Sequence, residues 1–270
     1  MDRTYVVTGA ASGIGAATTS YLRERGGRVI TCDLHHADVA ADLTTEAGRA
    51  ELVAGVTNRS GGRIDAIAAV AGGGPPQTSL QLNFFGAVAT LEGLRPLLQA
   101  SPTPRAVVVS SIASYTPTDP AIVEACLNLD ERRAIGAALE FASKTAPLDK
   151  MTAVQGLKVG LDLYANAKYA LNCWCRRAAV KAEWAGAGIT LNALAPGFID
   201  TPAAAYILAD PERRAAMGRL VPMRGAYPGR PEQMAAILAW CMSPENSLMT
   251  GQVLFVDGGV ECSQRGERSW

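Results

Sequence analysis

The residues with the clearest chemical potential are a tyrosine and a lysine, Tyr164 and Lys168, four positions apart. At this spacing two side chains lie on the same face of a helix. A phenol with its ordinary pKa near 10 is a poor base at neutral pH, but a neighbouring ammonium group favours the phenolate and lowers that pKa. The pair therefore indicates acid/base chemistry, although Tyr-x-x-x-Lys alone also occurs by chance on surface helices.

Two serines, Ser110 and Ser111, end the apolar run that begins at Ala106. In open α/β sheets ligands bind at the carboxyl ends of the strands. A hydroxyl there can hydrogen-bond a reacting oxygen, which makes the serines candidate partners of the tyrosine.

A glycine-rich loop follows the first apolar run directly, in the order Thr8-Gly-Ala-Ala-Ser-Gly-Ile-Gly15. Between a strand and a helix this pattern predicts a dinucleotide site, because the helix N-terminus offers free N–H groups to a pyrophosphate. We expect Gly9 to make the tight turn, and Gly13 and Gly15 to leave room for the close approach of the anion. The loop residues predicted to contact the cofactor are Gly9, Ser12, Gly13, Ile14 and Gly15.

An acidic residue, Asp33, ends the second apolar run, 18 residues beyond Gly15. A carboxylate there can accept both hydroxyls of the adenosine ribose and would repel a 2′-phosphate, so NAD is favoured over NADP. Asp42 and Leu43 follow a further short extended segment, where they either bind the adenine edge or, in the case of Asp42, cap the next helix. The oxidised nicotinamide of such a cofactor would further favour the phenolate of Tyr164.

Short apolar runs alternate with longer helical patterns, which is typical of parallel βαβ units. The runs are continuously apolar, as expected for strands covered by helices on both faces. We therefore predict a single-domain α/β Rossmann fold over residues 1–270, with a doubly wound parallel sheet. The predicted strands are 4–8, 28–32, 64–71, 106–110, 188–195 and 253–256, and the predicted helices are 14–25, 45–56, 79–98, 161–185 and 231–242.

Residues 114–160 exceed what this alternation needs between a strand and a helix. Apolar residues at helical spacing predict amphipathic helices at 121–129 and 130–141. We interpret the segment as a helical insertion before the helix that carries Tyr164.

The composition excludes several classes of protein. The 270 residues carry 25 Lys and Arg against 25 Asp and Glu, so no basic surplus supports nucleic-acid binding. The apolar runs are too short to span a membrane, and the start of the chain lacks a secretion-signal pattern, so a cytoplasmic protein is expected. The six cysteines show no framework spacing and are expected to be reduced thiols, and no metal site is predicted.

Taken together, these motifs resemble the short-chain dehydrogenase/reductase family across nearly the whole chain. The resemblance rests on the glycine loop, Asp33, Asn83, Ser111, Tyr164 and Lys168, Asn192-Ala-Leu-Ala-Pro-Gly197 and Asp257-Gly-Gly259 in that order. It implies that Tyr164 is the acid/base, that Ser111 rather than Ser110 bonds the substrate oxygen, that Lys168 lowers the tyrosine pKa and holds the nicotinamide ribose, and that Asn83 supports a proton-relay water. It also implies cofactor contacts from Ala71, Gly72, Pro196, Gly197, Ile199 and Thr201.

Two features depart from the usual pattern of the family. Ala69-Val-Ala-Gly72 stands where an Asn-Asn-Ala-Gly run is common, so other side chains must stabilise that strand. The step from Ser111 to Tyr164 is 53 residues, where many members use about a dozen. With several local motifs, this insertion resembles the subgroup of bacterial 3α-hydroxysteroid dehydrogenase/carbonyl reductases and coniferyl-alcohol dehydrogenases.

The resemblance implies an NAD-dependent oxidoreductase that interconverts an apolar cyclic alcohol and its ketone or aldehyde. A 3α-hydroxysteroid dehydrogenase/carbonyl reductase is the first hypothesis, and a coniferyl- or other aromatic-alcohol dehydrogenase is the second. A non-catalytic NAD-sensing protein is the alternative of another class, disfavoured because Ser111, Tyr164 and Lys168 are all present. The segment 198–228 is predicted to be a substrate lid, with about half of its apolar residues lining the pocket. Because the insertion precedes a helix that pairs subunits in many relatives, we expect a homodimer rather than a tetramer.

Overall fold

The computed structural model describes residues 3–145 and 151–267 of the chain. In these residues seven parallel strands form one sheet in the order β3-β2-β1-β4-β5-β6-β7. Consecutive strands run outward in opposite directions from β1 and β4, which makes the β1/β4 boundary the topological switch point where such sheets bind ligands. The strands are β1 (Thr4–Thr8), β2 (Arg28–Asp33), β3 (Val39–Ala40), β4 (Ala66–Ala69), β5 (Arg105–Val109), β6 (Thr190–Pro196) and β7 (Val253–Val256).

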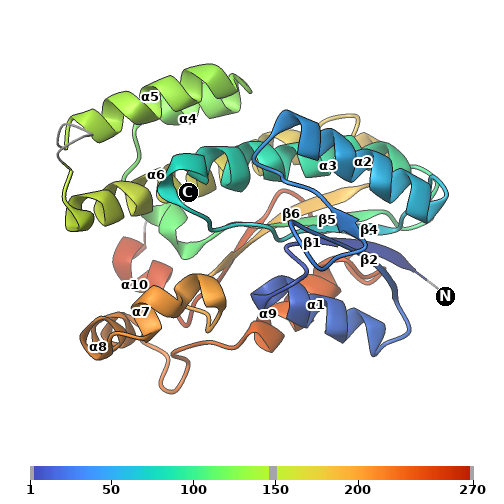
Figure 1. Cartoon of the computed structure of the whole chain (residues 1–270). Helices are drawn as coiled ribbons and strands as arrows, with labels where there is room; N and C mark the ends of the chain where they lie inside the picture. The colour runs from blue at the N-terminus through green and yellow to red at the C-terminus, as the bar shows by residue number, and fades with distance from the viewer. Residues whose placement is uncertain (1–2, 146–150, 268–270) are drawn as a thin grey trace.

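Helices cover both faces of the sheet, so the doubly wound prediction is confirmed (Figure 1). On one face lie α2 (Glu46–Ser60), α3 (Ala87–Leu98) and α6 (Ala153–Ala179), and on the other lie α1 (Gly13–Arg23) and α9 (Pro231–Cys241). The remaining α-helices are α4 (Pro120–Leu127), α5 (Glu131–Ser143), α7 (Ala205–Leu208), α8 (Pro211–Leu220) and α10 (Val260–Arg265). Short 3₁₀ helices are η1 (Pro76–Thr78), η3 (Ile112–Tyr115), η5 (Ala185–Ala187) and η6 (Pro202–Ala204), and η2 (Gln81–Gly86) is a π-helix.

Each central strand divides its side chains between two hydrophobic cores. In β5, Ala106 and Val108 belong to the core beneath α2, α3 and α6, whereas Val107 and Val109 belong to the core beneath α1 and α9. Successive residues of a strand point to opposite faces, so a strand buried on both sides must be apolar at every position. This is why the strand sequences show no alternation.

Several predicted boundaries were wrong. The helix that carries Tyr164 begins at Ala153, eight residues before the predicted start, and it ends at Ala179. Strand β3 is the short extended segment expected before Asp42, the helices α7, α8 and α10 were not predicted, and the predicted helix 79–98 contains the π-helix η2.

The predicted insertion contains α4 and α5, close to the expected positions, whereas its last part belongs to α6; residues 146–150 lie outside the described residues. In Figure 1, α4 and α5 lie beyond α6 on the side away from the sheet. The α4 side chains Ile122, Ala125 and Cys126 are fully buried and belong to the same core as α6. The insertion is therefore packed onto the body of the protein.

Within the described residues, no helix is both long enough and apolar enough to cross a membrane. No group of three His, Cys, Asp or Glu side chains in these residues is placed to hold a metal ion.

Candidate active site

A cleft of about 810 Å³ lies at the carboxyl ends of the central strands. It is lined by the glycine loop, by the ends of β2, β4, β5 and β6, and by the face of α6 that carries Tyr164 and Lys168. Every residue predicted from the sequence to bind cofactor or substrate lines this cleft, with the exception of Asn83.

The glycine loop forms the turn between β1 and α1. Gly9 and Gly13 adopt positive φ angles of 66° and 52°, which favour glycine. A Cβ on Gly15 would lie 2.0 Å from the Gly9 carbonyl oxygen, so Gly15 is required for close packing of α1 on the loop rather than for room around an anion. Ser12 precedes α1 and makes no side-chain capping hydrogen bond. The first N–H groups of the helix therefore face a cradle that suits a pyrophosphate.

Asp33 ends β2 beside this loop. Its Oδ2 accepts from the Ala11 amide at 2.9 Å, and its Oδ1 accepts from the Leu34 amide at 2.7 Å. Each carboxylate oxygen has a second lone pair, so the side chain can still accept from two ribose hydroxyls. Among the described residues Lys168 is the only lysine or arginine lining the cleft, and none lines the part near Asp33.

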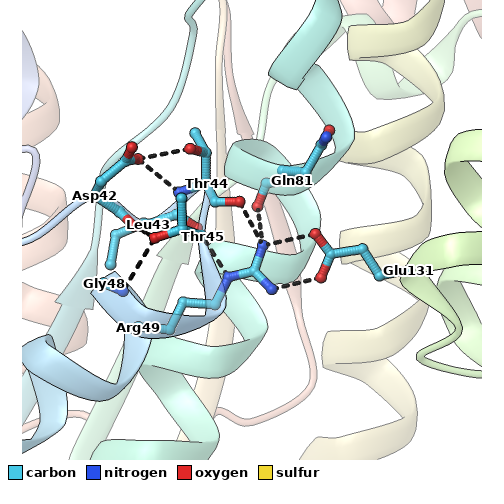
Figure 2. A network of polar contacts seen from close by, with 8 residues as sticks. All are labelled: Asp42, Leu43, Thr44, Thr45, Gly48, Arg49, Gln81 and Glu131. Carbon is cyan, nitrogen blue, oxygen red and sulfur yellow. Dashed lines mark hydrogen bonds and ion pairs between the residues drawn. The ribbon is translucent and has the colours of Figure 1, made fainter.

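Asp42 and Leu43 lie on a loop that lines the cleft beyond Asp33 (Figure 2). Asp42 Oδ1 accepts from the Thr44 amide at 2.9 Å and from the Thr44 hydroxyl at 2.7 Å, and these bonds lower the pKa of the Asp42 carboxyl. The cap of α2 is Thr45, whose hydroxyl accepts from the Gly48 amide. The alternative in which Asp42 caps this helix is therefore wrong, and its carboxylate instead orders the loop.

The two serines after β5 have different surroundings. The Ser110 hydroxyl is buried and donates to the Lys168 carbonyl of α6 at 3.3 Å. Ser111 is the N-cap of η3, where its hydroxyl accepts from the Ala113 amide at 3.1 Å, and it is close enough to the Tyr164 phenol to lower the pKa of that group. Ser111 is thus the serine in contact with the tyrosine.

Tyr164 and Lys168 face the cleft from one side of α6. Burial raises the pKa of Tyr164, and the hydrogen bond with Ser111 acts in the opposite direction. Burial lowers the pKa of Lys168 to about 7, while its Nζ donates to the Val109 carbonyl at 2.8 Å and lies 5.6 Å from the centre of the Tyr164 ring. In the protein without cofactor, burial of the phenolate thus outweighs the hydrogen bond and raises the tyrosine pKa, while burial of Lys168 itself disfavours its ammonium form.

Asn83 lies in the π-helix η2, fully buried behind the wall of the cleft. Its side chain accepts from the Gly73 amide and donates to the Gly73 and Ser79 carbonyls, each at 2.9 Å. A Cβ on Gly72 would lie 3.0 Å from Asn83 Oδ1 and 3.2 Å from Lys168 Nζ, so Asn83 and Lys168 flank the Gly72 backbone. In this structure Asn83 fixes the chain after β4.

Ala69-Val-Ala-Gly72 lacks the asparagine side chains that are common at this place in the family, and Thr8 at the end of β1 supplies hydrogen bonds there instead. The Thr8 hydroxyl accepts from the Val70 amide at 3.0 Å and from the Ala71 amide at 3.1 Å. This places Ala71 and Gly72 at the edge of the cleft next to Gly9.

The residues predicted to contact the nicotinamide lie at and just after the end of β6, where they line the cleft. A Cβ on Gly197 would lie 2.7 Å from the Asp257 Cα, which explains the glycine after Pro196. Ile199 is buried, and the Thr201 methyl group would lie 3.1 Å from a Cβ on Gly13. The segment after β6 therefore closes against the glycine loop.

The apolar part of the cleft has two walls, of which one was predicted. Phe198, Ile199, Tyr206 and Ile207 line it, whereas Leu208, Met217, Leu220, Val221 and Met223 do not, so the expected half of the apolar residues contributes. The opposite wall comes from the early turns of α6 and from η1, and its residues were not predicted: Pro75, Pro76, Thr78, Leu157, Gly160 and Leu161. A Cβ on Gly160 would lie 2.7 Å from the Pro76 Cγ, so α6 and η1 are in close contact there.

A dinucleotide cradle, a Ser-Tyr-Lys cluster and an apolar end in one cleft define a nicotinamide-dependent oxidoreductase acting on a hydroxyl or carbonyl group. Comparison with known proteins agrees. The short chain dehydrogenase family model matches residues 3–123, and the enoyl-(acyl carrier protein) reductase model matches residues 137–261.

The 3-alpha-hydroxysteroid dehydrogenase/carbonyl reductase of Comamonas testosteroni is 34% identical over 264 residues, covering 96% of this chain and 97% of the relative. The cis-4-hydroxycyclohexanecarboxylate dehydrogenase of Sinomonas cyclohexanicum is 30% identical over 263 residues, covering 96% of each chain. The crystal structure of the 3-alpha-hydroxysteroid dehydrogenase from Pseudomonas sp. B-0831 with NADH superposes with a TM-score of 0.83 at 35% identity, covering 98% of this chain and all of the other. The chain belongs to the short-chain dehydrogenase/reductase family and uses a nicotinamide dinucleotide cofactor.

Proposed function

We propose that this protein is an NAD-dependent dehydrogenase/carbonyl reductase of apolar cyclic alcohols, with 3α-hydroxysteroids as its first substrate class. The observation that carries the proposal is the contact of the Ser111 and Tyr164 hydroxyls, beside buried Lys168, at the junction of the dinucleotide cradle and the apolar part of the cleft. Two relatives across the whole chain are named for oxidoreductases of ring-bearing alcohols, which agrees with this substrate class.

The proposed mechanism gives each polar side chain one task. Bound oxidised cofactor supplies the acceptor for the hydride that leaves the alcohol carbon. Ser111 donates a hydrogen bond to the substrate oxygen, and Tyr164 takes the proton from that oxygen as the carbonyl forms. Lys168 binds the nicotinamide ribose and, with the positive charge of the oxidised ring, favours the phenolate against the desolvation that opposes it. In the reductive direction Tyr164 returns the proton.

Selectivity for NAD over NADP follows from the adenosine end of the cleft. Asp33 presents a carboxylate there, and no lysine or arginine among the described residues lines that part of the cleft to pair a 2′-phosphate. We assign the remaining cofactor contacts to the glycine loop, Asp42 and Leu43, Ala71 and Gly72, and the segment from Pro196 to Thr201.

The segment 198–228 serves as the lid over the substrate. Tyr206 and Ile207 from α7 line the cleft, yet no residue of α7 or α8 is fully buried. Helices with so few buried contacts open at low free-energy cost. The packing of α4 on α6 covers part of the helix that pairs subunits in many relatives, which supports the expected dimer.

The direct test is the initial rate of nicotinamide reduction with NAD⁺ or NADP⁺, using a 3α-hydroxysteroid or coniferyl alcohol. NAD⁺-dependent turnover of the steroid, reduced at least about 100-fold in Tyr164→Phe, is expected. Tyr169→Phe is the matched control, because Tyr169 is also on α6 but does not line the cleft. Turnover of coniferyl alcohol alone would select the aromatic-alcohol branch, and binding of NAD⁺ without turnover of either alcohol would contradict the proposal.

A further inference from the structure

The side chain of Arg49 connects the adenosine end of the cleft to the insertion (Figure 2). From α2, its Nε donates to the Leu43 carbonyl at 2.9 Å, and one terminal nitrogen donates to the Gln81 carbonyl at 3.1 Å. Both terminal nitrogens pair with the Glu131 carboxylate of α5, at 2.5 and 3.1 Å. One guanidinium therefore joins the loop before α2 to two segments that are distant in the sequence, η2 and the insertion.

The contact with Leu43 matters because Leu43 and its neighbours Asp42 and Thr44 line the cleft. Arg49 also donates to the Thr44 carbonyl at 3.4 Å. A Cβ on Gly86 would lie 2.9 Å from the Leu43 carbonyl oxygen, so η2 presses on the same peptide from another side. The direction of the backbone groups that this loop offers to a nucleotide is thus fixed by Arg49.

Glu131 is the acid that keeps this guanidinium in place. The Arg49 side chain is only 12% exposed, and a charge so far removed from water needs a paired partner. A carboxylate that accepts two parallel N–H bonds fixes the plane of a guanidinium as well as neutralising it. Glu131 is the first residue of α5, so the partner is supplied by the insertion and not by the sheet or its covering helices.

We propose that Arg49 and Glu131 are positioning residues for the adenosine half of the cofactor, through which the α4–α5 insertion raises cofactor affinity. The proposal rests on the proposed function to the extent that the cleft binds a dinucleotide. It gives the insertion a role at the cofactor site, through Glu131, which is 82 residues from Arg49 in the sequence.

The test is the affinity of the full chain for AMP, NAD⁺ and nicotinamide mononucleotide, measured by calorimetry for wild type and Glu131→Gln. Loss of the charged pair is expected to weaken AMP and NAD⁺ binding about three- to tenfold. Nicotinamide mononucleotide binding and kcat at saturating NAD⁺ should stay within about twofold, because Arg49 contacts neither Lys168 nor Tyr164. The KM for NAD⁺ should therefore rise without a matching fall in kcat.

Glu124→Gln is the matched control. Glu124 pairs with Arg133 at 3.3 Å within the insertion, both side chains are more than half exposed, and neither lines the cleft. Like Glu131→Gln, this substitution removes the charge of an acid that pairs with an arginine. Because this pair is exposed and does not line the cleft, AMP affinity should stay within about twofold of wild type.

A second variant, Arg49→Lys, separates positioning from a general effect of charge. It keeps the positive charge but cannot hold Glu131 with a bidentate pair, so AMP affinity should fall as in Glu131→Gln. Adding Glu131→Gln to Arg49→Lys should then weaken AMP binding little further.

Unchanged AMP affinity in Glu131→Gln would overturn the inference, as would an equal loss for AMP and nicotinamide mononucleotide. Failure of the proposed function is seen separately, as absence of turnover by wild type, because the comparison of nucleotide affinities needs no alcohol substrate.

Discussion

Replacing Lys168 by methionine should change the stability of the protein in a strongly pH-dependent way. The folded protein holds the pKa of Lys168 at about 7, against an ordinary value of 10.5. Between these values folding releases a proton from the lysine, so the stability of the wild type rises with pH across this range. At pH 7 the buried lysine lowers the free energy of unfolding by about 4 kcal/mol, and at pH 9 by about 2 kcal/mol.

Methionine has a similar length and no titratable group, so the part of the pH dependence of stability that comes from Lys168 disappears in Lys168→Met. The variant loses the bond to the Val109 carbonyl, at a cost of about 1–3 kcal/mol that does not depend on pH. We expect Lys168→Met to be inactive and yet more stable than wild type at pH 7. The advantage should shrink by about 2 kcal/mol between pH 7 and pH 9.

The assay is urea unfolding of cofactor-free protein, followed by the fluorescence of the four tryptophans at pH 7, 8 and 9 and at one protein concentration. Lys158→Met is the control, because Lys158 is an exposed residue of the same helix whose ion pair with Asp162 lies at the surface. Its difference from wild type should stay within about 0.5 kcal/mol at each pH. A difference between wild type and Lys168→Met that is the same at pH 7 and pH 9 would refute the reasoning.

Four further predictions concern the cofactor, the chemistry, the loop and the assembly. Asp33→Asn should lower the preference for NAD⁺ over NADP⁺, measured as the ratio of kcat/KM, by about tenfold, because the repulsion of the 2′-phosphate is lost. Ser111→Ala should lower kcat about 100-fold, whereas Ser110→Ala, which loses a buried bond to the backbone of α6, should lower mainly the unfolding free energy, by about 1 kcal/mol. Gly15→Ala should abolish NAD⁺ binding in calorimetry, because its Cβ would lie 2.0 Å from a carbonyl oxygen, whereas Gly136→Ala, which meets open space, should raise the unfolding free energy by about 0.5–1 kcal/mol. Light scattering should show a dimer, and a stable tetramer would contradict the prediction.

The sheet and the cofactor loop could be predicted because their physical requirements are local. A strand buried on both faces needs an apolar middle, as in Val6–Val7 of β1 and Ala106–Val109 of β5, and a tight turn before a helix needs glycine where φ is positive, as at Gly9 and Gly13. Such requirements can be recognised from residues that are adjacent in the sequence. The close-packing task of Gly15 was missed because it depends on where α1 sits on the loop.

The surroundings of Tyr164 and Lys168 were harder to predict, because burial depends on every segment that packs around them. Their spacing placed both side chains on one face of a helix, and the structure confirms that placement. The sequence could not show that desolvation raises the pKa of the tyrosine and lowers that of the lysine. The ion pair of Arg49 and Glu131 is hidden for the same reason, since the two residues are 82 positions apart.

The first turns of α6 line the substrate part of the cleft, but their glycines made this part of the helix hard to predict from the sequence. The helix was predicted only from residue 161, and Gly156 and Gly160 before that point each disfavour a helix by about 1 kcal/mol relative to alanine. The helix begins earlier because Thr152 and Gln155 form a capping box. Gly160 allows α6 to approach Pro76, where a Cβ would lie only 2.7 Å from the proline ring. Gly160 therefore marks a close approach, unlike Gly156 in the same helix, and this approach brings together the two segments that form the second wall of the substrate cleft.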